Sequence, residues 1–95
     1  MKEVYIANIK TAQEVTDFFM VKSIAMKIGA NKKQYLDVML ADKTGEISGK
    51  KWDVADEELP SLAQIKEGDI VKIRANVTEW NGLKQFRVQI GRAHV

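Results

Sequence analysis

Hydrophobic and polar residues alternate along five segments of the chain, which is the pattern of strands with one face in a core. The segments are residues 15–28, 35–41, 46–52, 69–79 and 83–90. Asn81-Gly82 separates the last two segments and is a pair favoured in two-residue hairpin turns. The pattern therefore predicts five short strands, the last two joined as a hairpin.

The first segment changes parity in its middle. Phe19 and Val21 share one parity, whereas Ile24, Met26 and Ile28 share the other. A β-bulge near residues 22–23 would reconcile the two halves, because one extra residue moves the following side chains to the opposite face. We therefore expect both hydrophobic sets to face inward.

Residues 53–68 have a different pattern. Val54, Leu59, Leu62 and Ile65 recur at near-helical spacing among acidic residues, and Pro60 is suited to a first helical turn. Five strands with a short helix between the third and fourth is the order of an OB-fold, a partly open Greek-key barrel. An SH3-like barrel is the nearest alternative, but it usually lacks this helix. We expect an all-β OB-fold domain over 15–90, with an N-terminal arm (1–14) and a C-terminal tail (91–95).

Composition excludes several functional classes. The 95 residues include no cysteine and one histidine, His94. This excludes disulfide scaffolds, thiolate nucleophiles, zinc ribbons and histidine-based triads. No apolar run approaches a membrane-spanning length, and the N-terminus lacks the apolar core of a signal peptide. We expect a cytoplasmic protein without a membrane partner, a cofactor or a metal.

The net charge of +2 hides an uneven distribution. Residues 53–69 hold six acidic groups and one basic group, so the remainder holds 14 basic and 7 acidic groups, a balance of +7. This predicts a basic barrel that attracts phosphates and an acidic connector that steers a polyanion away from its own end. The alternative is that the lysines serve only solubility.

Aromatic residues accompany the positive charges. Single-stranded nucleic acid is bound by aromatic faces that stack on bases, beside cations that follow the backbone. Tyr35 and Trp52 have outward parity on strands two and three, the usual binding strands of an OB-fold, and Trp80 adjoins the hairpin turn. The candidate phosphate contacts are Lys32, Lys33, Lys50, Arg74, Lys84 and Arg87. Alternatively, each aromatic packs on the barrel and each arginine pairs with a nearby carboxylate.

Several motifs resemble one OB-domain family. They are Phe18-Phe19-Met20-Val21-Lys22, Tyr35-Leu36, Asp42-Lys43-Thr44-Gly45-Glu46-Ile47, Lys51-Trp52-Asp53, Glu67-Gly68-Asp69-Ile70-Val71 and Asn81-Gly82. The chain resembles, over residues 15–90, the N-terminal domain of YhaM-type exoribonucleases of Gram-positive bacteria. The resemblance implies a domain that binds single-stranded substrate ahead of an HD-type metal-dependent nuclease domain. This sequence contains no His-Asp metal pair, and Asn31-Lys32-Lys33 stands where an Asn-Gly-Lys turn is typical.

These observations favour a non-catalytic domain that binds single-stranded nucleic acid, RNA rather than DNA, with little sequence preference. Ser48 has no evident base beside it, and the acidic cluster lacks the spacing of a calcium loop. In a full-length protein the partner would be a C-terminal HD-type nuclease domain. One alternative is a protein-interaction module that docks a nuclease domain or mediates oligomerisation, with Phe18, Met39 and Trp80 exposed. Another is an oligosaccharide- or small-ligand-binding OB domain.

Overall fold

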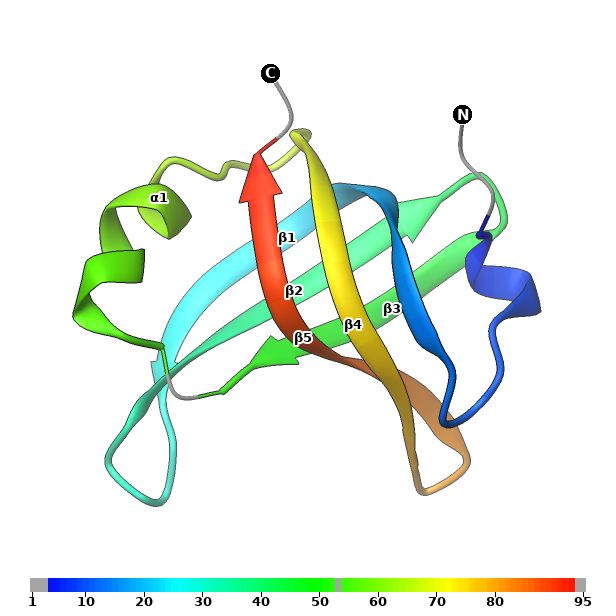
Figure 1. The fold of residues 1–95 in the computed structure, drawn as a ribbon, viewed down its shortest axis with the longest axis horizontal. Helices are drawn as coiled ribbons and strands as arrows, with labels where there is room; N and C mark the ends of the chain where they lie inside the picture. Colours follow the sequence, from blue (N-terminus) through cyan, green and yellow to red (C-terminus); the bar gives the residue numbers. More distant parts are fainter. Residues whose placement is uncertain (1–3, 53, 94–95) are drawn as a thin grey trace.

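The computed structural model describes residues 4–52 and 54–93, so Asp53 and the end of the predicted tail, with His94, lie outside the described residues. Five strands close into a barrel in the order β1-β2-β3-β5-β4 (Figure 1). They are β1 (Glu14–Ile28), β2 (Gln34–Asp42), β3 (Gly45–Lys51), β4 (Ile70–Trp80) and β5 (Leu83–Ala93). The short helices are η1 (Ile6–Asn8), η2 (Asp56–Glu58) and α1 (Leu59–Ala63). The predicted OB-fold is confirmed.

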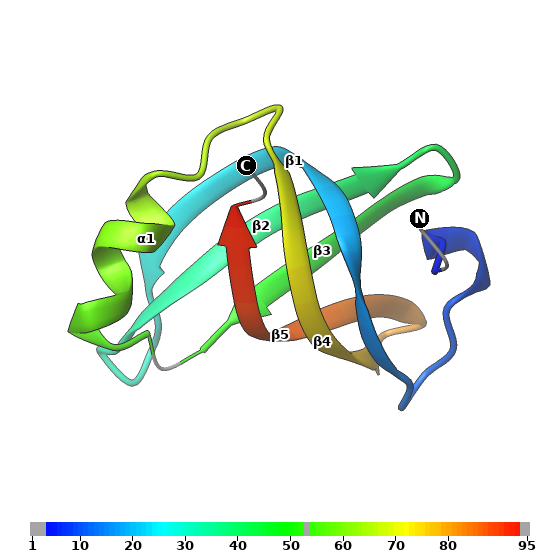
Figure 2. The same cartoon turned by 45° about the horizontal axis from the view of Figure 1, so that its top comes forward.

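The barrel is built from one long sheet and a hairpin that crosses it. β1, β2 and β3 pair antiparallel in sequence, and β4 and β5 pass in front of β2 and β3 (Figure 2). β4 pairs with β1, and β5 pairs with both β4 and β3, which closes the barrel. Phe19 and Phe86 meet edge to face in the core, with ring centroids 5.3 Å apart.

The register of β1 shifts between Val21 and Ser23, where a bulge was predicted. Ile24 packs against the core after this shift, as expected. Met26 and Ile28 are instead 42% and 72% exposed, although they pair with the strand that carries Leu36. They differ from the prediction because the β1–β2 hairpin continues beyond the barrel, where no core remains to bury them.

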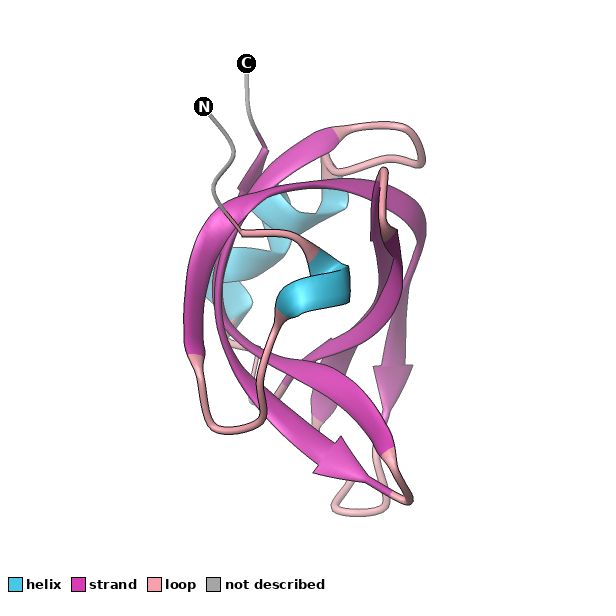
Figure 3. Ribbon diagram, turned by 90° about the vertical axis from the view of Figure 1, so that its right-hand side faces the viewer, coloured by secondary structure: helices cyan, strands magenta, loops and turns pink. Residues whose placement is uncertain are grey.

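The two ends of the barrel are covered by different segments. Leu62 of α1 and Ile65 are buried at one end. At the other end η1 lies across the opening (Figure 3), and Ile9, which follows it, is 3% exposed. The backbone N–H of Ile6 donates to the Asp42 carboxylate at 2.8 Å, which ties the arm to β2. The N-terminal arm is thus part of the packed domain.

The described ends of the chain lie on one side of the barrel. Figure 1 shows the start of the described chain and the end of β5 towards the top, while the β1–β2 and β4–β5 turns extend at the bottom. None of the helices that the structure describes combines the length and hydrophobicity that a membrane crossing requires.

An ion pair between a buried lysine and a partly exposed glutamate links β3 to the helical connector. Lys51 is 8% exposed, and its Nζ lies 2.7 Å from Oε2 of Glu58. The other oxygen, Oε1, accepts from the Ala55 N–H at 3.2 Å. The hydrogen bond from Lys51, followed by that from the Ala55 backbone, lowers the pKa of Glu58 below its ordinary value of 4.5. Alternation along β3 points the Lys51 side chain inward. Its positive charge therefore needs a carboxylate partner within the fold, and Glu58 provides it.

We expect Glu58→Ala to reduce the free energy of unfolding by about 1–2 kcal/mol, because it leaves the Lys51 ammonium with no counterion in a largely buried site. Urea denaturation measures the loss, and Glu57→Ala is the matched control, since Glu57 is exposed on the same turn. A carboxyl with a lowered folded-state pKa contributes stability that is present above pH 4.5 and lost as pH falls through that lowered pKa. The difference between the wild type and Glu58→Ala should therefore disappear on acidification. An undiminished effect in a Lys51→Met background would contradict this account.

Two turns require left-handed backbone. Asn81 and Gly82 have φ of 52° and 78°, which matches the predicted hairpin turn. Lys32, in the turn between β1 and β2, has φ of 64°. This is the position where the resembled family typically has glycine. Lysine keeps a positive charge there but carries a Cβ that disfavours this conformation.

Lys32→Gly should therefore stabilise the domain by about 0.5–1 kcal/mol, because glycine adopts positive φ without the Cβ penalty. Lys33→Gly removes the same charge one residue later, where φ is not positive, and should not stabilise. Thermal unfolding of the two variants at one pH measures the contrast. Equal shifts in melting temperature would show that charge, rather than backbone conformation, controls the turn.

Candidate nucleic-acid interface

The geometry of the candidate site begins with the short parallel pairing between β3 and β5. Its residue pairs are Ser48–Gln85, Gly49–Phe86 and Lys50–Arg87. Gly49 points inward, and a Cβ there would lie 3.3 Å from Val88 Cγ2 and 3.4 Å from Val38 Cγ2. The alternation of side chains then turns Lys50 and Arg87 outward, next to one another on neighbouring strands.

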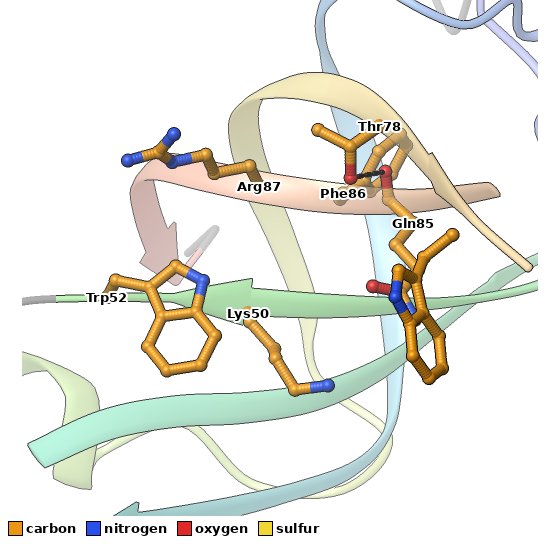
Figure 4. Close-up of a pocket in the computed structure, with 7 residues that line it drawn as sticks. Lys50, Trp52, Thr78, Gln85, Phe86 and Arg87 are labelled. Carbon is orange, nitrogen blue, oxygen red and sulfur yellow. Dashed lines mark hydrogen bonds between the residues drawn. The ribbon is translucent and has the colours of Figure 1, made fainter. Parts of the chain in front are cut away.

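An open groove of about 610 Å³ lies over this pairing. It is lined by Lys50, Trp52, Thr78, Trp80, Gln85, Phe86 and Arg87. Figure 4 shows the Lys50 side chain between Trp52 and Gln85, with Arg87 on the same side as Trp52. The groove thus combines indole rings, two cations and neutral polar groups.

Its aromatic residues are displayed rather than buried. Trp52 is 43% exposed, and its ring packs at a tilt against Tyr35, with centroids 4.5 Å apart and an interplanar angle of 33°. Trp80 is 67% exposed at the end of β4. One face of the Trp52 ring is therefore supported by the protein. Such a supported, exposed indole is suited to stacking against a flat ligand.

Lys50 and Arg87 form no ion pair or hydrogen bond with the residues that the structure describes, whereas several other cations do. Nζ of Lys27 lies 2.8 Å from Asp37, and the hydrogen bond that Lys27 donates to this carboxylate raises the pKa of Lys27. Lys22 lies 3.7 Å from Glu46. The two groove cations therefore keep their positive charge available to an anion.

The structure places the remaining predicted cations elsewhere. Arg74 lies 3.4 Å from Glu14, on the β1–β4 face of the barrel, and does not line the groove. Nζ of Lys84 donates to the Ile9 carbonyl at 2.9 Å and so holds the N-terminal arm. Lys32 and Lys33 are exposed in the β1–β2 turn, across the end of β3 from the β4–β5 turn (Figure 1). Of the predicted residues, the groove thus unites Lys50, Trp52, Trp80 and Arg87, with Tyr35 behind Trp52.

A smaller hollow of about 250 Å³ adjoins the groove and shares Lys50 with it. Its lining includes Ser23, Lys27, Asp37, Met39 and Ser48, on β1, β2 and β3. The sequence suggested Met39 for the alternative protein-interaction surface and gave Ser48 no base, but it predicted none of these five residues as a nucleic-acid contact. The sequence also did not single out Thr78 and Gln85. Their only signal was an outward position in the alternation, and neighbouring polar residues on the same strands share that position.

Comparison with known proteins agrees with the sequence resemblance. The 3'-5' exoribonuclease YhaM of Geobacillus sp. (strain WCH70) is 30% identical over 84 residues, which are 88% of this chain and 25% of that protein. The chain thus spans about a quarter of the length of this curated relative. The predicted resemblance to YhaM is confirmed over that span. No protein-family model matches the chain.

Solved structures share the fold. A domain of replication protein A from Methanococcus maripaludis has a TM-score of 0.73 and 24% identity, over 95% of this chain and 92% of that one. The second OB-fold domain of the same protein, solved by NMR, has a TM-score of 0.70 and 20% identity, with the same coverage. A replication protein A heterotrimer bound to ssDNA has a TM-score of 0.66 and 16% identity, over 86% and 57%. The protein is an OB-fold domain.

The pairing of Lys50 with Arg87 predicts a measurable cost to the free domain, because like charges on directly paired residues repel. Arg87→Gln should raise the free energy of unfolding by about 0.2–0.5 kcal/mol at low salt, and the gain should shrink as salt screens the charges. Arg74→Gln is the matched control, since it removes an arginine that has an acidic partner and should not stabilise. Salt-dependent urea titrations measure both variants. A loss of stability in Arg87→Gln would contradict the prediction.

Proposed function

We propose that this domain binds single-stranded nucleic acid in the groove between β3 and β5, RNA in preference to DNA. The observation that carries the proposal is that one groove holds two exposed indoles together with two cations, Lys50 and Arg87, that pair with none of the described residues. Aromatic faces beside a cationic path are what single-stranded nucleic acid requires, because each nucleotide offers a flat base and a charged phosphate. The similarity to an exoribonuclease supports RNA as the substrate class.

In this proposal the residues have separate roles. A base stacks on the outer face of Trp52, whose inner side rests on Tyr35, and Trp80 supports a second base across the groove. Lys50 and Arg87 contact phosphates between them. Lys32 and Lys33 attract the strand towards the β1–β2 turn. Arg74 and Lys84, which hold protein partners, add only to the general positive field.

The domain would serve as a substrate-recruiting module and not as a catalyst. Its groove contains cations, aromatic rings and neutral polar groups, a set that binds a polyanion without cutting it. We propose that in a longer exoribonuclease-like protein it holds the single strand for a separate nuclease domain of the HD type. Binding then depends on phosphate charge and base stacking far more than on base identity.

We expect oligo-U to quench the tryptophan fluorescence at low salt, with an affinity that falls as salt rises. The double variant Lys50→Gln/Arg87→Gln should reduce the slope of log affinity against log salt by about 1.4, because each phosphate contact on a single strand contributes about 0.7. The control is Lys10→Gln/Lys72→Gln, which removes two exposed charges outside the groove. Equal slopes in the two double variants would contradict the assignment of the groove.

Trp52→Ala should weaken oligo-U binding by at least about fivefold, because stacking of one base on an aromatic ring contributes about 1–3 kcal/mol. The salt slope should stay unchanged, since no charge is removed. Tyr35→Ala should cause a smaller loss by removing the support behind the indole. Unchanged affinity in Trp52→Ala, in a variant that circular dichroism shows to be folded, would overturn the stacking role.

A further inference from the structure

Gln85 occupies a distinctive position in the groove. It lies on β5, is half-buried, and pairs with Ser48 of β3 on one side and Thr78 of β4 on the other. Its backbone carbonyl accepts a hydrogen bond from the Thr78 hydroxyl at 3.5 Å, so this carbonyl already has a partner within the protein (Figure 4). The side-chain amide forms no hydrogen bond with the residues that the structure describes. The amide is therefore a donor and acceptor that remains available to a ligand within the proposed binding groove.

The Gln85 amide thus has hydrogen-bonding capacity that none of the described residues uses. The amide offers two donors and one acceptor, and withdrawing it from water costs free energy unless a partner replaces the water. Trp52 and Trp80, which line the same groove, would hold bases by their flat faces. A base held by its face presents its edge sideways, where a neighbouring amide can reach donors and acceptors on it.

We infer that Gln85 hydrogen-bonds the edge of an adenine in the groove and gives the domain a modest preference for this base. The amide geometry matches adenine, whose N6 amino group donates while N7 accepts, so that both bonds form in one plane. The inference rests on the proposed function, because it needs a base in the groove. Recognition of the base edge by Gln85 involves no charged group, so this preference for adenine should not change with salt.

The test compares two hexamers that differ at one ring atom of every base, oligo-A and oligo-7-deazaadenine. Both stack on indoles in the same way, but only the first has the N7 acceptor. The wild type should bind oligo-A about fivefold more tightly than the 7-deaza hexamer, which is the ordinary contribution of one hydrogen bond. In Gln85→Leu the two hexamers should bind equally, whereas the salt slope should be unchanged.

Gln89→Leu is the matched control, because Gln89 is exposed on the same strand and does not line the groove. It should retain the fivefold difference between the hexamers. Equal binding of the two hexamers by the wild type, or a difference that persists in Gln85→Leu, would overturn the role of Gln85 and leave the proposed function standing. Failure to bind either hexamer at low salt would overturn the proposed function itself.

Discussion

The parallel pairing of β3 with β5 is the constraint on which both the barrel and the groove depend. It involves only three residue pairs, and it brings two chain segments together that lie more than thirty residues apart. Gly49 makes the approach possible, since a side chain there would press on Val38 and Val88. The next residue along each strand then has to face outward. The same pairing therefore both closes the barrel and places Lys50 beside Arg87, so a change in its register would alter both.

Two adjacent lysines on β3 show how a shift of one residue along a strand separates an internal ion pair from a groove-lining cation. Lys51 points towards the interior, and the fold neutralises it with Glu58 of the connector. Lys50 points towards the groove and forms no ion pair with the residues that the structure describes. The same chain thus satisfies a cation where burial makes an unpaired charge costly, and leaves one unsatisfied where solvent lowers that cost. Arg87, which is exposed in the same groove, is a second cation of this kind.

Much of the fold follows from the sequence, because alternation, the bulge near Lys22 and the Asn81-Gly82 turn are local signals. The structure places Trp52 and Lys50 together, as their shared parity predicted. Contacts between distant segments have no such signal, which is why the attachment of Lys84 to Ile9 and of Arg74 to Glu14 did not emerge. Gln85 was equally hidden. Its outward parity matched that of Gln89, and only the pairing of β3 with β5, which includes Gln85 and not Gln89, distinguishes the two.

The position of the described chain ends has a practical consequence. The two turns that flank the groove extend on the side of the barrel opposite to those ends (Figure 1). A linker, fluorophore or surface tether attached at either end would leave the groove facing outward. The domain could therefore be immobilised on a sensor by one end with the groove still open to solution.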